Sequence, residues 1–160
     1  MREQIGNLFI SIAERIAGKK LYKVDLKTVE RMLIDDDYKS NFSVRDIREK
    51  SQEWIIELEE RKELVPAVLK GKDVVFNGFM NMVEIIDHPF KGKMVYLRFY
   101  RRKWKERGKK ESYSNEYKLH PEGMKATPKF GNFLKELTRQ ERDEFFCAFP
   151  DIRHLWKEDF

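Results

Sequence analysis

The residues best suited to binding chemistry in this sequence are basic and aromatic side chains between positions 91 and 110. Ten lysines and arginines and one acid, Glu106, fall in this basic window. The window carries a charge of +9 while the whole chain of 160 residues carries +5, so the remaining residues sum to −4. Cations bind phosphate groups, and aromatic rings stack on bases. The window therefore predicts contacts with nucleic acid by Lys91, Lys93, Tyr96, Arg98, Tyr100, Arg101, Arg102, Lys103, Trp104, Lys105, Arg107, Lys109 and Lys110.

Alternating residue types predict that positions 95–104 form a β-strand with two different faces. One face is apolar at first and basic later, whereas the other interleaves arginine with aromatic residues. The two sets are Val95, Leu97, Phe99, Arg101, Lys103 and Lys105, and Tyr96, Arg98, Tyr100, Arg102 and Trp104. In one interpretation a two-stranded basic ribbon lies on nucleic acid, with the turn 107–110 on the phosphate backbone. In the other, the charges protect an exposed strand from edge pairing, and aromatic rings pack under arginine stems.

Residues with catalytic potential are few. Glu84, Asp87 and His88 near a strand end offer a small metal-dependent nuclease site, but a histidine before Pro89 is more typical of a turn. The acidic run 35–37 lacks the spaced ligands of a metal site and fits a solvated helix end. The sequence contains no glycine-rich phosphate loop, serine-hydrolase motif or zinc-peptidase motif. We therefore expect a protein without catalytic activity, metal or other cofactor.

The single cysteine and the two remaining histidines are expected to be structural. Cys147 lies among three phenylalanines and is predicted to be a buried small apolar residue. His120 precedes a proline in a turn, and His154 lies in an amphipathic C-terminal segment. One cysteine excludes an internal disulfide, and no apolar run approaches the roughly 18 residues of a membrane span. A reducing cytoplasm is the expected location.

The first seventy residues are predicted to be helical. Positions 5–16 show apolar residues at helical spacing, and a second helix is expected from Asp25 to Ile34. Ser43 followed by Asp46 resembles a capping box, so a third helix is expected from there to about residue 63. Its apolar stripe would consist of Val44, Ile47, Trp54, Ile55 and Leu58.

From residue 73 the apolar positions change to a period of two. Strands are predicted at 74–76, 82–86, 95–104 and 112–119, with turns at 77–78, 87–93 and 107–109. Helices are expected to start at Thr127-Pro128, at a capping box formed by Thr138 and Glu141, and near Pro150. The prediction is an α+β fold with N-terminal helices, a central antiparallel β-meander of about four strands, and C-terminal helices. Residues 1–70 and 71–160 are expected to be two parts of the chain, divided near 66–72, or one continuous domain.

The order of short motifs between residues 77 and 137 resembles a known family. Asn77-Gly78-Phe79 is followed by the segment 85–93, by Val95-Tyr96-Leu97 and by the basic cluster 101–104. After a spacer come residues 122–127 and the helix positions 130–134. This order is similar to the N-terminal region of insertion-sequence transposases, which is often encoded as a separate short protein upstream of the catalytic one.

The resemblance implies a protein of a mobile element that helps to recognise the ends of the element DNA, with a separately encoded catalytic transposase as a partner. By position, it implies DNA contacts from Lys91, Lys93, Arg101, Arg102, Lys103 and Trp104. More distant relatives hold a zinc ribbon before the basic strand, but the required cysteines are lacking here, so no metal is implied. The residues leave three alternatives open: RNA in place of DNA, a homodimer, and a protein-interaction module that docks on an acidic partner.

Overall fold

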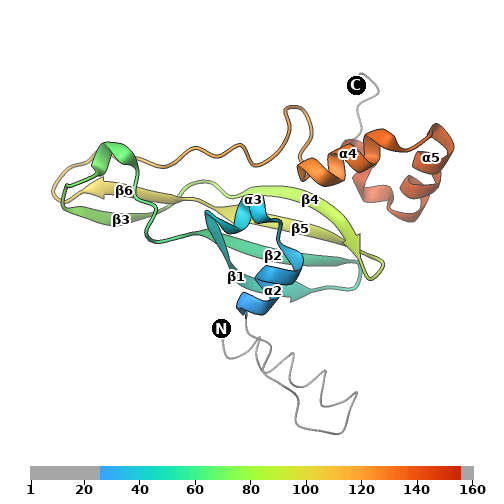
Figure 1. Cartoon of the computed structure of the whole chain (residues 1–160), viewed down its shortest axis with the longest axis horizontal. Coiled ribbons are helices and arrows are strands. Elements are labelled where there is room, and N and C mark those ends of the chain that lie inside the picture. Colours follow the sequence, from blue (N-terminus) through green and yellow to red (C-terminus); the bar gives the residue numbers. More distant parts are fainter. Residues whose placement is uncertain (1–25, 156–160) are drawn as a thin grey trace, which may run out of the picture.

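The computed structural model describes residues 26–155 (Figure 1). The helix expected at 5–16 lies outside this range. In chain order the elements are α2 (Leu26–Leu33), α3 (Asp36–Lys39), β1 (Phe42–Glu49), β2 (Glu53–Glu60), η1 (Ala67–Leu69), β3 (Val74–Phe79), β4 (Val83–Phe90), β5 (Lys93–Tyr100), β6 (Arg102–Glu106), α4 (Pro128–Glu136), α5 (Arg139–Ala148) and η2 (Pro150–Leu155), where η denotes a 3₁₀ helix. Helices and sheets are both present, which confirms the predicted α+β class.

Four strands form a mixed sheet in the order β1-β2-β5-β4. The pairs β1–β2 and β4–β5 are antiparallel, but β2 and β5 are parallel, so the sheet is not the antiparallel meander that the sequence predicts. β2 lies inside the sheet because Ile55, Ile56 and Leu58, each at most 2% exposed, fill both of its faces. Chain segments on both sides of the boundary expected near 66–72 therefore share one sheet.

The helix predicted from Ser43 to about residue 63 is wrong, because this segment forms the hairpin β1–β2. The spacing of its apolar residues fits a helix and a strand alike. A bulge between Val44 and Asp46 interrupts the two-residue alternation that would otherwise indicate a strand. Valine and isoleucine recur here, and their branched side chains favour strands. The hairpin turn lies at 50–53, where Lys50 N donates to Glu53 O (2.8 Å).

The two faces of the four-stranded sheet contact different helices. Ile85 and Ile86 of β4 are neighbours in sequence but belong to separate apolar clusters, because side chains alternate along a strand. The cluster of Ile85 includes residues of α2 and α3, and the cluster of Ile86 includes residues of α4, α5 and η2. Figure 1 shows α4 and α5 gathered beyond one end of the sheet.

The C-terminal helices begin where the sequence predicts. The Thr127 hydroxyl accepts a hydrogen bond from Phe130 N (3.3 Å) ahead of Pro128, and Thr138 and Glu141 form a reciprocal capping box. Both predictions are confirmed. Leu26–Leu33 likewise forms the core of the second predicted helix.

β3 and β6 form a separate two-stranded sheet that projects from the main sheet (Figure 1). We call residues 70–79 and 102–111 the arm. The strand predicted at 95–104 is divided at Arg101 into β5 and β6, which lie in different sheets. The turn predicted at Asn77-Gly78 is instead an irregularity within β3, where Gly78 has a φ of +84°.

The end of the arm partly follows the prediction. Residues 107–108 form the expected turn, with Gly108 at a φ of +79°. The strand predicted at 112–119 is wrong except at Tyr113, which forms an isolated bridge with Trp104. The rest of that segment forms neither a strand nor a helix. Within residues 26–155, no helix is long and apolar enough to cross a membrane.

Candidate nucleic-acid interface

The basic window does not form one compact patch. β5 and β6 follow one another, so Lys91 and Lys93 lie at the β4–β5 turn while Arg107 and Lys110 lie at the free end of the arm. At about 3.3 Å per residue, Lys93 and Glu106 are on the order of 40 Å apart. Any interface at the arm therefore excludes the residues of the β4–β5 turn, unless a ligand spans the whole length of the molecule.

Within residues 26–155, six of the ten cations of the window form ion pairs, five of them with acids outside the window. Arg98 contacts Glu84 (2.7 Å), Lys93 contacts Glu49 (2.6 Å), and Arg107 contacts Asp73 (2.7 Å). The further pairs are Arg101–Glu116 (3.4 Å), Lys109–Glu106 (3.9 Å) and Arg102–Glu59. Among the described residues, the window cations without an ion pair are Lys91, Lys103, Lys105 and Lys110.

Arg102 and Trp104 are packed inside the arm. Arg102 is 6% and Trp104 8% exposed, and the Arg102 guanidinium lies over the ring of Phe76 at 4.8 Å. The Trp104 ring meets Phe76 edge-on at 6.2 Å. Neither side chain is exposed enough to contact a base. This face of β6 therefore agrees with the second interpretation of the sequence, in which aromatic rings pack under arginine stems.

The two tyrosines of the window are also engaged within the molecule. Tyr96 packs against the cluster of α4 and α5, and burial raises the pKa of its phenol. The Tyr100 ring lies under the Arg45 guanidinium (4.9 Å), and its hydroxyl donates to Glu57 Oε1 (3.4 Å). Burial and the neighbouring carboxylate of Glu57 raise the pKa of Tyr100. Both phenols stay protonated at neutral pH.

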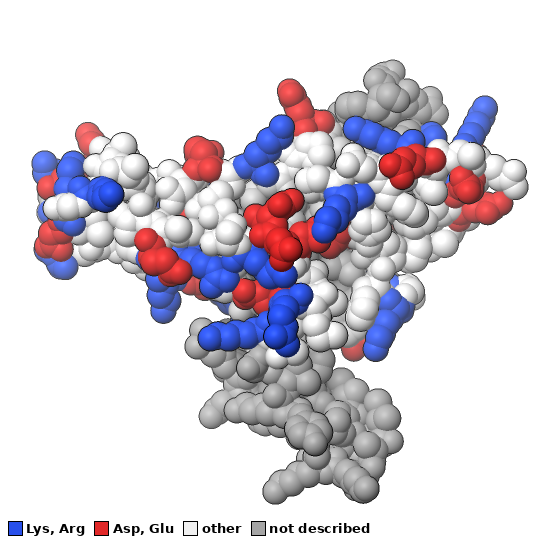
Figure 2. Space-filling view, in the orientation of Figure 1, with Lys and Arg blue, Asp and Glu red and all other residues white. Residues whose placement is uncertain are grey.

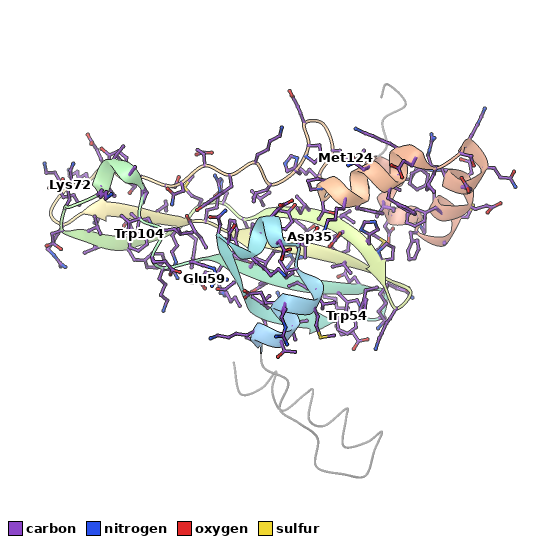
Figure 3. The ribbon with its side chains drawn as sticks, in the orientation of Figure 1. Asp35, Trp54, Glu59, Lys72, Trp104 and Met124 are labelled. Carbon is purple, nitrogen blue, oxygen red and sulfur yellow. The ribbon has the colours of Figure 1, made fainter. Side chains whose placement is uncertain are left out.

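A buried carboxylate, absent from the predicted site, joins the arm to the main sheet. Glu60 is 1% exposed and accepts hydrogen bonds from Arg102 N (2.6 Å), Asn115 Nδ2 (2.7 Å) and Tyr117 Oη (2.5 Å). Burial and the bond to Glu60 raise the pKa of Tyr117, which keeps the hydroxyl a donor. In Figure 3, Glu59, the residue before Glu60, lies where the arm meets the sheet. No local motif indicates these partners, because they are more than forty residues from Glu60 in the sequence.

The outer part of the arm retains a surplus of positive charge. The arm contains eight basic and three acidic residues. The three acids are engaged: Asp73 with Arg107, Glu106 with Lys72 (3.6 Å) and Glu111 with the Tyr113 hydroxyl (2.8 Å). Figure 2 shows lysine and arginine side chains gathered at the free end of the arm with a few acids between them, and Figure 3 places Lys72 at that end.

Lys103 and Lys105 project from the face of β6 opposite Arg102 and Trp104, since side chains alternate along the strand. Both are half-buried, and Lys110 is exposed just beyond the turn. The cations of the basic window that lie at the surface of the arm are therefore Lys103, Lys105, Arg107, Lys109 and Lys110.

The residues of the alternative nuclease site have other partners. Glu84 pairs with Arg98, and Asp87 Oδ1 accepts from the Thr127 hydroxyl (2.8 Å). The His88 ring packs against Phe130 (5.0 Å between centroids), with Nδ1 3.3 Å from Asp87 Oδ1. Within residues 26–155, no group of three histidine, cysteine or acidic side chains is placed to hold a metal ion.

The remaining singled-out residues lie at the surface or at element ends. Cys147 is exposed, so the prediction of a buried residue is wrong: α5 turns Phe146 inward, and the next residue points outward. Asp35 precedes α3 and pairs with Lys129 (2.7 Å). His120 is half-buried and contacts the carbonyl of Pro121 (2.8 Å), and His154 is exposed in η2.

Comparison with protein-family models, with curated proteins and with solved structures found no match to this chain.

Proposed function

We propose that this protein is a non-catalytic, cytoplasmic DNA-binding protein of a mobile element, and that the arm carries the DNA contact. The observation that carries the proposal is the set Lys103, Lys105 and Lys110, which form no ion pair among the described residues although the three acids of the arm are engaged. Free cations on a projecting element attract phosphate and release counterions on binding. The role at the ends of element DNA, with a separately encoded transposase as partner, rests on the resemblance over residues 77–137.

The shape of the arm supports this proposal. A two-stranded β-ribbon fits the major groove of B-DNA, and β3 and β6 form such a ribbon, with the turn that follows β6 at its free end. Lys103 and Lys105 lie on one face of the ribbon, and Arg107, Lys109 and Lys110 lie at its tip. We assign these five side chains to phosphate contacts. Arg102 and Trp104 then act within the arm, as packing that holds the ribbon in shape.

The test is fluorescence anisotropy of a labelled DNA duplex titrated with the protein at several salt concentrations. Each phosphate contact contributes about −0.9 to the slope of log K against log salt, so five contacts give a slope of about −4 to −5. Replacing Lys103, Lys105 and Lys110 by glutamine breaks none of the ion pairs within residues 26–155 and should reduce the magnitude of that slope by about 3.

The matched control replaces three exposed lysines outside the arm, Lys27, Lys118 and Lys125, by glutamine, which changes the net charge equally. The control should keep the wild-type slope. Equal losses of affinity in the two triple variants would mean that net charge and not the arm attracts DNA. Absence of binding to duplex DNA at low salt would overturn the proposal.

A further inference from the structure

The outer edge of β3 differs from the other strand edges in the part of the chain that the structure describes. At the β4 edge, Ile86 N donates to Lys125 O (3.0 Å) and Thr127 N donates to Ile86 O (2.8 Å). At the β1 edge, the Glu30 carboxylate accepts from Val44 N (2.9 Å) beside a bulge. At the β6 edge, Trp104 exchanges two hydrogen bonds with Tyr113 (2.8 and 2.7 Å). The sheet order gives β3 no second neighbour, and Figure 1 shows no strand or helix beyond it.

The register shows which backbone groups of β3 face outward. Arg107 N donates to Asp73 O (2.8 Å), so the backbone groups of Asp73 point toward the β6 side of the arm. Backbone groups alternate in direction along a strand, so those of Val74 and Phe76 point away from β6. This agrees with Trp104, which lies opposite Phe76 in the ladder and directs its own N–H and C=O to Tyr113.

The side chains of this edge include none of the residue types by which proteins prevent strand addition, although β3 carries an irregularity between Phe76 and Phe79. Charged residues and proline are the usual protection of an edge strand. Neither occurs from Val74 to Val83, although 38% of the chain is charged. Phe76 is 45% exposed on this edge strand, and Met82, shortly after its end, is 41% exposed. The edge therefore offers unpaired backbone groups together with apolar side chains.

We propose that β3 is a docking edge for an extended, acidic segment of another polypeptide, which adds a strand to the arm. Backbone hydrogen bonds to Val74 and Phe76 would provide affinity, as in other cases of strand addition. The positive charge of the arm determines which kind of polypeptide can bind at this edge. A second copy of this chain would place one basic arm against another, whereas acidic side chains would meet the surplus of positive charge.

The register also predicts the pattern of the added segment. Val75 lies opposite Lys105, so the two side chains share a face, and Val74, Phe76 and Trp104 share the other. A residue added beside Val75 is about 10 Å from the Lys105 backbone, two strand spacings away. A lysine and a glutamate side chain together span that gap. The segment should therefore alternate acidic residues, on the lysine face, with apolar residues on the Phe76 face.

The test uses a labelled hexapeptide of alternating glutamate and valine, titrated with the full chain and followed by anisotropy. Two further peptides carry N-methyl groups, one on every valine and the other on every glutamate. Along an added strand, the N–H groups of alternate residues point toward β3, so either the valine or the glutamate N–H groups form the hydrogen bonds. The peptide methylated on the other residue type should bind like the parent, and the peptide methylated on the bonded type should bind at least tenfold more weakly. Which of them loses binding reports the strand orientation, because parallel and antiparallel ladders use different N–H groups.

Hydrogen exchange then locates the bound peptide without any change to the protein. The amides of Val74 and Phe76 should become protected when the peptide binds, and a lysine–valine peptide should leave them unprotected. Equal binding by both methylated peptides, or no binding by the parent, would overturn the proposal. So would protection of these two amides that rises with protein concentration in the absence of peptide, because a second copy would then occupy the edge. These measurements contain no DNA, so their outcome is independent of the DNA-binding experiment.

Discussion

Replacing Glu60 by glutamine should destabilise the protein strongly, because the change leaves a buried donor facing another donor. One carboxylate oxygen accepts from Asn115 Nδ2 and Tyr117 Oη, and the other accepts from Arg102 N. A glutamine has one acceptor oxygen and one NH₂ group. Its NH₂ group must face either the Arg102 N–H or the Asn115 amide, which is held in place by a second bond to Leu64 O (2.7 Å).

The size of the effect follows from burial and charge. A buried donor without a partner costs about 1–3 kcal/mol, and hydrogen bonds to an ionised acceptor are roughly twice as strong as neutral ones. Glu60 is 1% exposed, so water cannot replace the lost partner. We expect the free energy of unfolding of Glu60→Gln to fall by about 2–4 kcal/mol.

The assay is urea unfolding followed by tryptophan fluorescence, with Glu63→Gln as the matched control. Glu63 lies three positions further along and is exposed, so its replacement should change the free energy of unfolding by no more than about 0.5 kcal/mol. A loss of 2–4 kcal/mol corresponds to a lower urea midpoint by about 1–2 M for a domain of this size. If the two variants unfold at the same urea midpoint, the hydrogen bonds of Glu60 do not hold the arm to the sheet.

Two further substitutions test local features of the fold. Thr127→Ala should lower the free energy of unfolding by about 1–2 kcal/mol, because it removes the cap of α4 and a donor to Asp87 (2.8 Å). Thermal unfolding followed by circular dichroism should show that Thr127→Ser retains most of the wild-type stability. An equal loss of stability in both variants would contradict the capping role. Gly78→Ala should lower the free energy of unfolding by about 1–2 kcal/mol, because Gly78 has a φ of +84° that strains other residues. An added Cβ would meet no atom within 4 Å, so the loss would come from the backbone alone. Gly78→Asn should recover part of that loss in the same assay, and an unchanged stability of Gly78→Ala would refute the strain.

The features that sequence predicts correctly depend on residues close together in the chain. The cap at Thr127, the capping box of Thr138 and Glu141, and the turn at Gly108 each involve only a few consecutive positions. A hydroxyl that accepts from a backbone N–H three residues later needs no tertiary context. Such signals survive in the folded protein because nothing distant competes with them.

The segment from Ser43 to residue 63 shows the opposite case. Its polar and apolar spacing is compatible with a helix, and Ser43 with Asp46 resembles a cap. The choice of strand is made by partners far away, since β2 pairs along its length with β5, about forty residues later in the chain. Burial of Ile55, Ile56 and Leu58 between two layers then outweighs local preference. A sequence read in short windows contains no trace of that pairing.

The charge of the basic window was predicted from composition, but its availability depends on the fold. Carboxylates from positions 49, 59, 73, 84 and 116 are brought against it, and none of these residues lies within the window. The sequence therefore identifies the region correctly as cation-rich and overstates how much of its charge faces solvent.

The two kinds of cation in the window are used differently. Each of its arginines forms an ion pair with an acid, whereas four of its six lysines form none among the described residues. The arginines are Arg98, Arg101, Arg102 and Arg107. The lysines without an ion pair in the described part of the chain are Lys91, Lys103, Lys105 and Lys110. The planar guanidinium has several fixed donors and suits a permanent contact within the fold, whereas the lysine ammonium is a mobile, hydrated point charge. Arg102 thus holds the arm to the sheet through Glu59, and Lys103, Lys105 and Lys110 supply charge that the arm presents. The charge count of a sequence window cannot separate these two uses, but the residue types within it can.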